Sequence, residues 1–576
     1  MYRIFSVALI ALCALSNMAY AQCYKPIAFE NIKVGGELRL RLTHNLNRFE
    51  EEKYQPDNVF LTEQQSGWWP GDTEGRTILA LVMEARALGC TPKYLDEIVR
   101  RVSSHLNQLG YMGTLHRDSL DEQQLSGNGW MLRGLCEYYL MKKDKKLLPL
   151  IQRMAESLYT AYPDLYDSYP ILPESRIKDI GEASGSLSQI CGRWRLSSDI
   201  GCVFIGMEGL LQALQVTGDD KLRPVAKKMV DLFLKVNLTD IRAQTHASLT
   251  AMRGLIRYAD ITGDNSYIEE VEKRWAIYRR YGMTECYANY NWFCRYNTWT
   301  EPCAIVDSYI VATLLWQHTG KSQYRDDAEC IYYNALCYAQ RANGGFGLET
   351  SPGIANSTSC ITPNCDEAHW CCTMRGGDGL GCAAHYTVVK NGDGYAIPFL
   401  RNVEVCDTFK GSPIKMEVKT KYPYSGNTTI SITQAPGSKM SMAFAKASWM
   451  TGYKVSVNGK RMSYKEHNGL AEIRYAFKSN DKIEIDFDMS PRYVATLNRD
   501  NTAAGDFRIM YGPLIMAGEI GNNGNVEYGE SFEDMGNTTF YGKKSGVVIS
   551  PLPHLMSPKI YKSTLPTYSQ RVIFAR

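Results

Sequence analysis

The chain has 576 residues, of which 44% are hydrophobic and 22% are charged, and its formal net charge at pH 7 is +3. This length exceeds one typical hydrophobic core, so we expect two or more domains with the composition of an ordinary globular protein. A net charge of +3 is small for this length and does not indicate binding to a polyanion, so we expect no nucleic-acid partner.

The N-terminus has the parts of a secretory signal. Arg3 supplies a positive charge, residues 4–15 form an apolar run too short to span a membrane, and Ala19 to Ala21 form a small-x-small cleavage site. We therefore predict a signal peptide over residues 1–21 and a periplasmic or secreted product. No later stretch is long and apolar enough for a transmembrane helix, so we expect no membrane span.

The cysteine count suggests disulfides. Of 17 cysteines, loss of Cys13 with the signal leaves 16, and an even number in an exported protein is typical of paired cysteines. Cys286 with Cys294 and Cys360 with Cys365 are possible local pairs, although spacing does not fix connectivity.

A short alternating stretch follows the signal. Residues 37–42 alternate charged and apolar side chains, which predicts a β-strand. Because this strand is isolated, we expect residues 22–60 to join a sheet formed elsewhere in the chain.

The next segment, residues 61–385, has a repeated helical pattern. Five times a helix with apolar periodicity ends in a short polar turn before another helix begins; the turns are 88–92, 142–144, 217–219, 262–264 and 319–321. Repeated helical hairpins of this length predict a closed toroid or a solenoid. Together with one hairpin that the pattern leaves unplaced, they fit a six-hairpin (α/α)6 barrel, whose site lies at the centre where inner helices begin.

The composition changes to a β pattern after Cys382. Short alternating stretches recur through residues 386–576, and Asn458-Gly459 is a strong two-residue hairpin signal. Such spacing predicts a β-sandwich. The expected fold class is therefore α+β multidomain, an (α/α)6 barrel followed by a β-sandwich.

The chemistry-bearing residues gather in the last helical hairpins. Glu301 and Cys303 stand two apart at the start of an apolar helical run, and Pro302 suits its first turn. Cys371 and Cys372 follow as an adjacent pair after a Gly-rich loop. Three sulfurs and one carboxylate are ligand types that tetrahedral zinc accepts, and a zinc-bound thiol is a thiolate, the nucleophilic form of cysteine. Spacing alone leaves both zinc and disulfides open.

These residues resemble a known family. Glu301-Pro302-Cys303-Ala304, a helix ending at Thr319-Gly320, then Tyr333-Asn334 and the Cys371-Cys372 pair are similar to glycoside hydrolase family 127 (GH127), zinc-dependent cysteine glycosidases that include β-L-arabinofuranosidases. In that family the acid/base glutamate lies sixteen residues before the zinc glutamate, and Glu285 stands sixteen before Glu301.

The resemblance implies a retaining hydrolase with a bound Zn2+. Glu301, Cys303, Cys371 and Cys372 would hold the metal, Cys371 would be the nucleophile, and Glu285 would protonate the leaving oxygen and later activate water. The implied substrate is a glycan, from which the enzyme would release terminal β-L-arabinofuranose or a related sugar of plant cell walls.

Further residues are candidates for contact with the sugar. His246 stands at an inner-helix start, where the family has a histidine that lines the sugar site. Asp72 precedes the first barrel helix and suits either hydroxyl binding or helix capping. Trp299 and Trp370 flank the proposed ligands and suit stacking on a sugar, although tryptophan more often only packs in a core.

The sequence also departs from the family and leaves more than one function open. Two family histidines have no counterpart near residues 128–130 and 203–205. Arginines in the segments around the site could instead bind a carboxylate bidentately, so an acidic or branched pectin sugar is an alternative substrate; they are Arg133, Arg193, Arg195 and Arg375. An inverting hydrolase or lyase that acts without metal would also fit the sequence, as would a non-catalytic carbohydrate-binding protein with structural zinc. The sequence does not indicate an oligomeric state.

Overall fold

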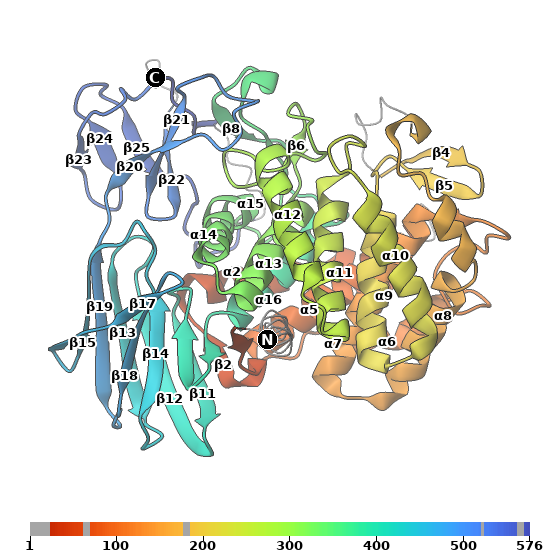
Figure 1. Ribbon diagram of the computed structural model, residues 1–576, viewed down its shortest axis with the longest axis horizontal. Coiled ribbons are helices and arrows are strands. Elements are labelled where there is room, and N and C mark those ends of the chain that lie inside the picture. Colours follow the sequence, from red (N-terminus) through yellow and green to blue (C-terminus); the bar gives the residue numbers. More distant parts are fainter. Residues whose placement is uncertain (1–22, 62–68, 177–184, 520–523, 562–568) are drawn as a thin grey trace, which may run out of the picture.

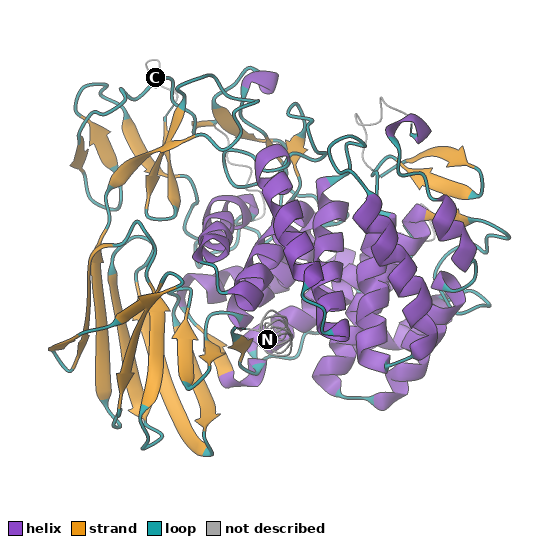
Figure 2. Ribbon diagram, viewed as in Figure 1, coloured by secondary structure: helices purple, strands orange, loops and turns teal. Residues whose placement is uncertain are grey.

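The computed structural model describes residues 23–61, 69–176, 185–519, 524–561 and 569–576. The predicted signal peptide lies outside these ranges. Figures 1 and 2 show a helical body on one side of the molecule and two stacked groups of strands on the other. Within the described ranges, no helix is both long and apolar enough to cross a membrane.

Six inner helices form a closed ring. Each packs on the next, and the last packs back on the first; in order they are α5 (Asp72–Leu88), α7 (Glu122–Lys142), α9 (Val203–Thr217), α11 (Thr245–Thr262), α13 (Pro302–Thr319) and α16 (Cys372–His385). The outer layer consists of α6 (Leu95–Arg101), α8 (Leu148–Tyr159), α10 (Arg223–Lys235), α12 (Ser266–Tyr281), α14 (Ser322–Ile331) with the π-helical turn Tyr332–Leu336 and α15 (Cys337–Ala339), and α2 (Gly36–Arg48). The chain therefore has the expected (α/α)6 barrel.

The sixth hairpin is completed by the N-terminus of the chain. Helix α2 packs on α16 and α5. The prediction of a strand over residues 37–42 is wrong, because these residues belong to helix α2. Leu38 and Leu42 fit a two-residue period, but they also stand four positions apart, which places them on one face of a helix. That face is buried and includes Arg41 and Asn45. Strand pairing begins just before, where β2 (Ile32–Val34) pairs with β11 (Val403–Phe409).

Glycines end the inner helices and let them approach closely. Gly89, Gly218, Gly263 and Gly320 follow α5, α9, α11 and α13 with φ of 66°, 68°, 74° and 70°, the left-handed conformation that closes a helix at each expected turn. Inside the ring, a Cβ at Gly75 would lie 2.2 Å from the backbone nitrogen of Met131. Helices α5 and α7 thus meet backbone to backbone.

A β-sandwich follows the barrel. One sheet has the order β1-β9-β10-β14-β18-β17, built from Lys25–Pro26, Val389–Asn391, Gly394–Ile397, Met440–Ala445, Leu470–Tyr475 and Lys465–His467. The other has the order β16-β15-β19-β13-β12-β11-β2, in which β16 is Lys460–Met462, β15 Thr451–Val457, β19 Asp481–Asp488, β13 Asn427–Gln434 and β12 Ser412–Thr420. Asn458 and Gly459, both with positive φ, form the predicted turn between β15 and β16.

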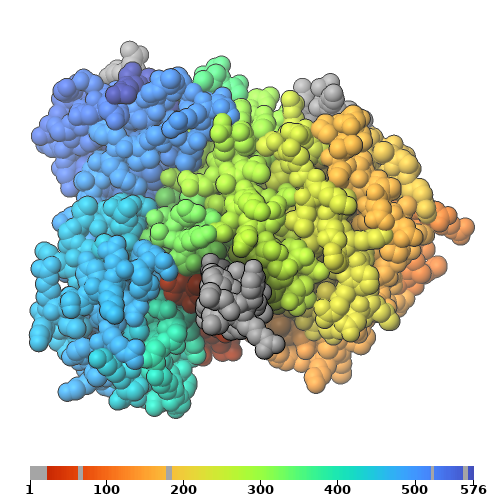
Figure 3. Space-filling model, in the orientation of Figure 1, coloured from red at the N-terminus to blue at the C-terminus, as the bar shows by residue number. Residues whose placement is uncertain are grey.

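A third sheet joins the C-terminal region to the barrel loops. Its C-terminal strands are β20 (Pro491–Ala495), β21 (Phe507–Tyr511), β22 (Leu514–Gly518), β23 (Phe532–Asp534), β24 (Phe540–Gly542), β25 (Val548–Pro551) and β26 (Gln570–Arg571). They continue into β8 (Cys360–Pro363), β7 (Glu349–Thr350) and β6 (Trp299–Thr300) of the barrel. Figure 3 shows the sandwich and this sheet stacked along one side of the barrel. A small sheet of β3 (Leu120–Asp121), β5 (Trp194–Ser197) and β4 (Leu187–Cys191) lies at the opposite end of the view in Figure 1.

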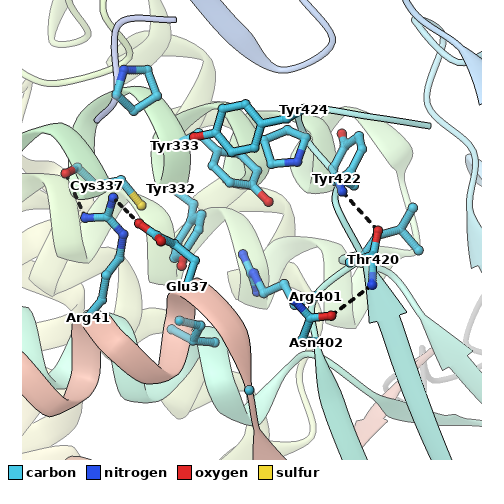
Figure 4. Close-up of a pocket in the computed structure, with 15 residues that line it drawn as sticks. Glu37, Arg41, Tyr332, Tyr333, Cys337, Arg401, Asn402, Thr420, Tyr422 and Tyr424 are labelled. Carbon is cyan, nitrogen blue, oxygen red and sulfur yellow. Dashed lines mark hydrogen bonds and ion pairs between the residues drawn. The ribbon is translucent and has the colours of Figure 1, made fainter. Parts of the chain in front are cut away.

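The seam between barrel and sandwich encloses a small cavity of about 50 Å³, shown in Figure 4. On the barrel side, Glu37 and Arg41 of α2 form an ion pair at 2.9 Å. On the sandwich side, the Arg401 guanidinium lies 4.1 Å from the centre of the Tyr332 ring. The cavity lies between the two domains and away from the predicted ligands.

The cysteines of the described ranges are unpaired. All 16 of them are free thiols, so Cys286 with Cys294 and Cys360 with Cys365 are not disulfides in this structure. The even count in the sequence was therefore a misleading signal.

Candidate metal centre and active site

Four side chains from two parts of the sequence converge at one end of the helical ring. One donor atom each from Glu301, Cys303, Cys371 and Cys372 lie within 4.8 Å of one another. The Cys372 sulfur is 3.7 Å from that of Cys303 and 3.3 Å from that of Cys371, distances too long for a disulfide bond. The arrangement offers four separate ligand atoms, three sulfurs and one carboxylate oxygen.

Two helix N-termini position these side chains. Glu301 is the N-cap of α13, and Pro302 takes the first helical position, where its missing N–H is not needed. Cys371 is the N-cap of α16, and Cys372 is the first residue of that helix. Because α13 and α16 are neighbours in the ring, their positive ends meet at the ligands and favour anionic groups there.

The ionisation of the four groups is interdependent. Although burial opposes it, hydrogen bonds from the thiols of Cys371 and Cys372 hold the pKa of Cys303 well below its usual value. The hydrogen bond with Cys303 raises the pKa of Cys371, while burial raises the pKa of Cys372 and of Glu301. A cation between the four groups would favour the anionic form of each.

The donor set fits zinc. Glu301 Oε2 is buried without a hydrogen-bond partner in the described ranges, so it is an acceptor that a metal would satisfy. Three cysteine sulfurs and a carboxylate oxygen are ligands that Zn2+ accepts in tetrahedral geometry. Three of the ligands are buried, whereas Cys371 is partly exposed. Cys371 is thus the ligand that a substrate can reach.

Arg76 of α5 contacts the cluster of Glu301, Cys303, Cys371 and Cys372. Its Nη1 donates to Cys303 Sγ at 3.3 Å, and its Nε lies 2.7 Å from Asp72 Oδ1. The guanidinium also lies 4.2 Å from the centre of the Trp130 ring. The N-cap of α5 is Gly71, so the prediction that Asp72 caps this helix is wrong. Asp72 is also buried, so it does not face solvent.

His246 also lies next to the cluster. Its Nδ1 is 3.7 Å from Glu301 Oε1, its Nε2 is 3.2 Å from Asp307 Oδ2, and the side chain is almost fully buried. Asp307 is in turn held by Arg253 and Arg375, each at 2.6 Å. His246 therefore lies beside the Glu301 carboxylate, and its predicted contact with a sugar stays a prediction.

Glu285 lies in a buried anion site. Its Oε2 accepts the Leu497 N–H at 2.8 Å, its Oε1 accepts the Asn498 N–H at 2.7 Å, and Arg508 Nε pairs with it at 3.2 Å. The residue is 0% exposed. Both carboxyl oxygens of Glu285 are therefore engaged in this structure, and its role as the acid/base residue stays a prediction. Glu285 ties the barrel to the loop between β20 and β21.

The tryptophans differ in their surroundings. Trp299 of β6 is half-buried and packs edge-on against Trp292, with ring centres 5.6 Å apart. Trp370 is 52% exposed and directly precedes Cys371. Trp370 is therefore better placed than Trp299 to meet a ligand from solvent.

The arginines expected near the site are already paired. Buried Arg133 pairs with Glu208 at 2.6 Å, and buried Arg375 pairs with Asp307 and Asp378. Arg193 pairs with Asp118, and Arg195 with Asp121. Each of the four arginines therefore has a carboxylate partner in this structure.

Sequence reasoning missed two residues of this site. Asp307 stands four positions after Cys303 and so shares its helix face, a local signal that was available. Arg76 stands four after Asp72, but its contact with Cys303 spans 227 positions and has no local signal.

Comparison with known families gives two matches along the chain. Residues 77–378 match the model of the β-L-arabinofuranosidase GH127 catalytic domain, and residues 401–489 match that of the GH127 middle domain. A search of curated protein sequences found no match.

Solved structures share the whole architecture. A GH127 β-arabinofuranosidase superposes with a TM-score of 0.68 at 16% identity, over 96% of this chain and 98% of the other. A GH127 β-L-arabinofuranosidase from Geobacillus stearothermophilus gives a TM-score of 0.67 at 13% identity, over 94% and 97%. A third structure, described as a glycoside hydrolase, gives 0.66 at 13%, over 97% and 99%. At these identities the likeness establishes a common fold.

Proposed function

We propose, since the chain belongs to the GH127 family of β-L-arabinofuranosidases and is a glycoside hydrolase, that Cys371 is its nucleophile. In this proposal the enzyme releases terminal β-L-arabinofuranose with retention of configuration. The observation that carries the proposal is the exposure pattern of the cluster. Cys371 is partly open to solvent while Glu301, Cys303 and Cys372 are buried. One sulfur is therefore available to a substrate and the other ligands are not.

The chain's own residues supply an attacking sulfur in a fixed position. Cys371 is held at the N-terminus of α16, where the helix dipole favours its anionic form. Its thiolate would attack the anomeric carbon and form a carbon–sulfur bond as the bond to the leaving oxygen breaks. Water would then displace the sulfur, and two inversions give net retention.

Glu301, Cys303, Cys371 and Cys372 would hold one Zn2+. When bound, zinc keeps its thiol ligands deprotonated and balances their charge. Buried Cys303 and Cys372, with Glu301 braced by His246, would keep the site rigid while Cys371 remains within reach of a sugar.

The leaving oxygen also needs a proton. We propose Glu285, sixteen residues before Glu301, as the donor; it would have to exchange the backbone N–H groups of residues 497 and 498, which its two oxygens accept in this structure, for the leaving oxygen.

The proposed substrate is a neutral plant cell-wall glycan with terminal β-L-arabinofuranose. Relatives named for this activity support it, and the carboxylate partners of Arg133 and Arg375 give an acidic sugar no free guanidinium. We propose export as well, on the strength of the signal in residues 1–21. A measured mass that corresponds to a chain beginning at Gln22 would support export. A mass that includes residues 1–21 would contradict it.

The test compares wild type with Cys371→Ser, purified under reducing conditions. We expect wild type to contain about one zinc per chain and to release arabinose from an aryl β-L-arabinofuranoside, and Cys371→Ser to lose turnover. An inhibitor with an electrophilic anomeric centre should label the peptide containing Cys371. Labelling elsewhere, or undiminished turnover by Cys371→Ser, contradicts the assignment of the nucleophile.

A further inference from the structure

The ligand set holds more negative charge than one divalent metal can cancel. With all three thiols deprotonated, the cluster of Glu301, Cys303, Cys371 and Cys372 would carry four negative charges, of which one Zn2+ would balance two. Glu301, Cys303 and Cys372 are buried, where an uncompensated charge is costly. A hydrogen-bond donor of the protein next to a ligand sulfur would lower that cost.

Arg76 is such a donor by its position. Among the hydrogen bonds found within the described ranges, the bond from Arg76 Nη1 to Cys303 Sγ is the one that joins a basic side chain to a sulfur of the cluster. His246 lies by the carboxylate ligand at 3.7 Å and touches no sulfur there. The positive charge on Arg76 thus lies directly against a ligand atom.

The guanidinium is fixed on three sides. Asp72 pairs with Nε at 2.7 Å, the face of Trp130 lies 4.2 Å from the guanidinium carbon, and the third side meets Cys303. The side chain is 5% exposed. A guanidinium held in one plane in this way can hold the sulfur in one place, because its donors have a fixed direction.

We propose that Arg76 is a positioning residue for the reaction: its hydrogen bond holds Cys303 as a metal ligand, with Asp72 and Trp130 holding Arg76. This inference rests on the proposed zinc site. A hydrogen bond to a thiolate lowers the charge that the sulfur donates to its metal, and groups that orient ligands in this way tune the metal they hold. Asp72 then acts through Arg76, which accounts for its burial away from solvent.

The test uses the whole protein with two substitutions of Arg76 and a matched control. Arg76→Met removes the charge and the donors, whereas Arg76→Lys keeps only the charge. The control is Arg133→Met, because Arg133 is also buried and lies over the same Trp130 ring at 4.9 Å, but it pairs with Glu208 and Asp378. Arg133→Met therefore reports what loss of a buried guanidinium does without loss of the sulfur contact.

Two readouts are independent of activity. One is zinc affinity, measured by competition with a chromophoric chelator. The other is the sulfur-to-metal charge-transfer band of protein loaded with Co2+. We expect Arg76→Met to weaken zinc binding about 10- to 100-fold and to shift the band, Arg76→Lys to have a smaller effect in both, and Arg133→Met to leave the band unchanged.

The outcomes separate this role from the proposed function. If wild type binds zinc and both Arg76 variants match it in affinity and band position, the role of Arg76 is overturned and the metal site stands. If Arg133→Met shifts the band as far as Arg76→Met, the effect is general to the core and the role is also overturned. If Arg76→Met does not fold, Arg76→Lys decides by the same two readouts. If reduced wild type binds neither metal, the proposed metal centre fails first.

Discussion

Replacement of Glu285 by Gln tests whether this residue anchors a loop or transfers a proton. The change keeps the shape of the side chain but removes its charge. Arg508, which is 1% exposed, would then be buried without its carboxylate, and one of the two N–H groups at residues 497 and 498 would face an amide NH2 group. Breaking a buried ion pair from one side costs about 3–5 kcal/mol, so we expect a large fall in the free energy of unfolding.

Urea unfolding of wild type, Glu285→Gln, Arg508→Met and the double variant measures this cost and isolates the coupling between the two residues. Activity is assayed in parallel on an aryl arabinofuranoside and on a glycan with a poor leaving group. An anchor predicts lower stability with the ratio of the two activities unchanged. A general acid predicts a loss concentrated on the poor leaving group, because an acidic leaving group needs less help. Unchanged stability together with that selective loss would refute the anchoring role.

Two further predictions concern the barrel. Gly75→Ala should lower the free energy of unfolding by about 1–3 kcal/mol, since its Cβ would lie 2.2 Å from the Met131 backbone nitrogen. Gly89→Ala is the control, because a Cβ there has nothing within 4 Å and only the backbone strain at φ 66° acts. Equal losses of stability in the two variants would contradict the packing argument. His385→Gln should flatten the pH dependence of stability, because burial, helped by Arg86, lowers the pKa of His385 from 6.5 to about 3. The neutral ring contributes stability in full above pH 6.5 and loses it as pH falls towards 3, with a slope of about 1.4 kcal/mol per pH unit. Urea unfolding at several pH values measures the slope, and identical slopes in wild type and variant would contradict the assignment.

Local patterns predicted much of the fold and the cluster of one glutamate and three cysteines. The polar turns at Gly218, Gly263 and Gly320 marked helix ends, because a residue in the left-handed conformation closes a helix wherever it occurs. Glu301-x-Cys303 and Cys371-Cys372 could be recognised because each pair lies on one helix start. Such signals depend only on neighbours in the chain.

Contacts between distant segments could not be predicted in this way. The partners of Glu285 lie more than 200 residues further along the chain, so its spacing to Glu301 gave no sign that both oxygens were occupied. The alternation at residues 37–42 fits a strand and a helix equally well, and packing against α16 decided between them. His246 stands at an inner-helix start as expected, but its neighbours Asp307 and Trp130 determine which group it touches.

Closure of the ring by α2 has a consequence for how the protein is made. Helix α2 lies against α16, the last inner helix of the barrel, and the Asn45 side chain donates to the carbonyl of Thr373, the residue after Cys372. The ring cannot close until about residue 385 has been synthesised, so the side chains of Glu301, Cys303, Cys371 and Cys372 come together late. A fragment trimmed to the matched catalytic region, residues 77–378, would lack α2 and the end of α16. The N-terminal segment is therefore a working part of the catalytic domain, although it lies outside the region by which that domain is recognised.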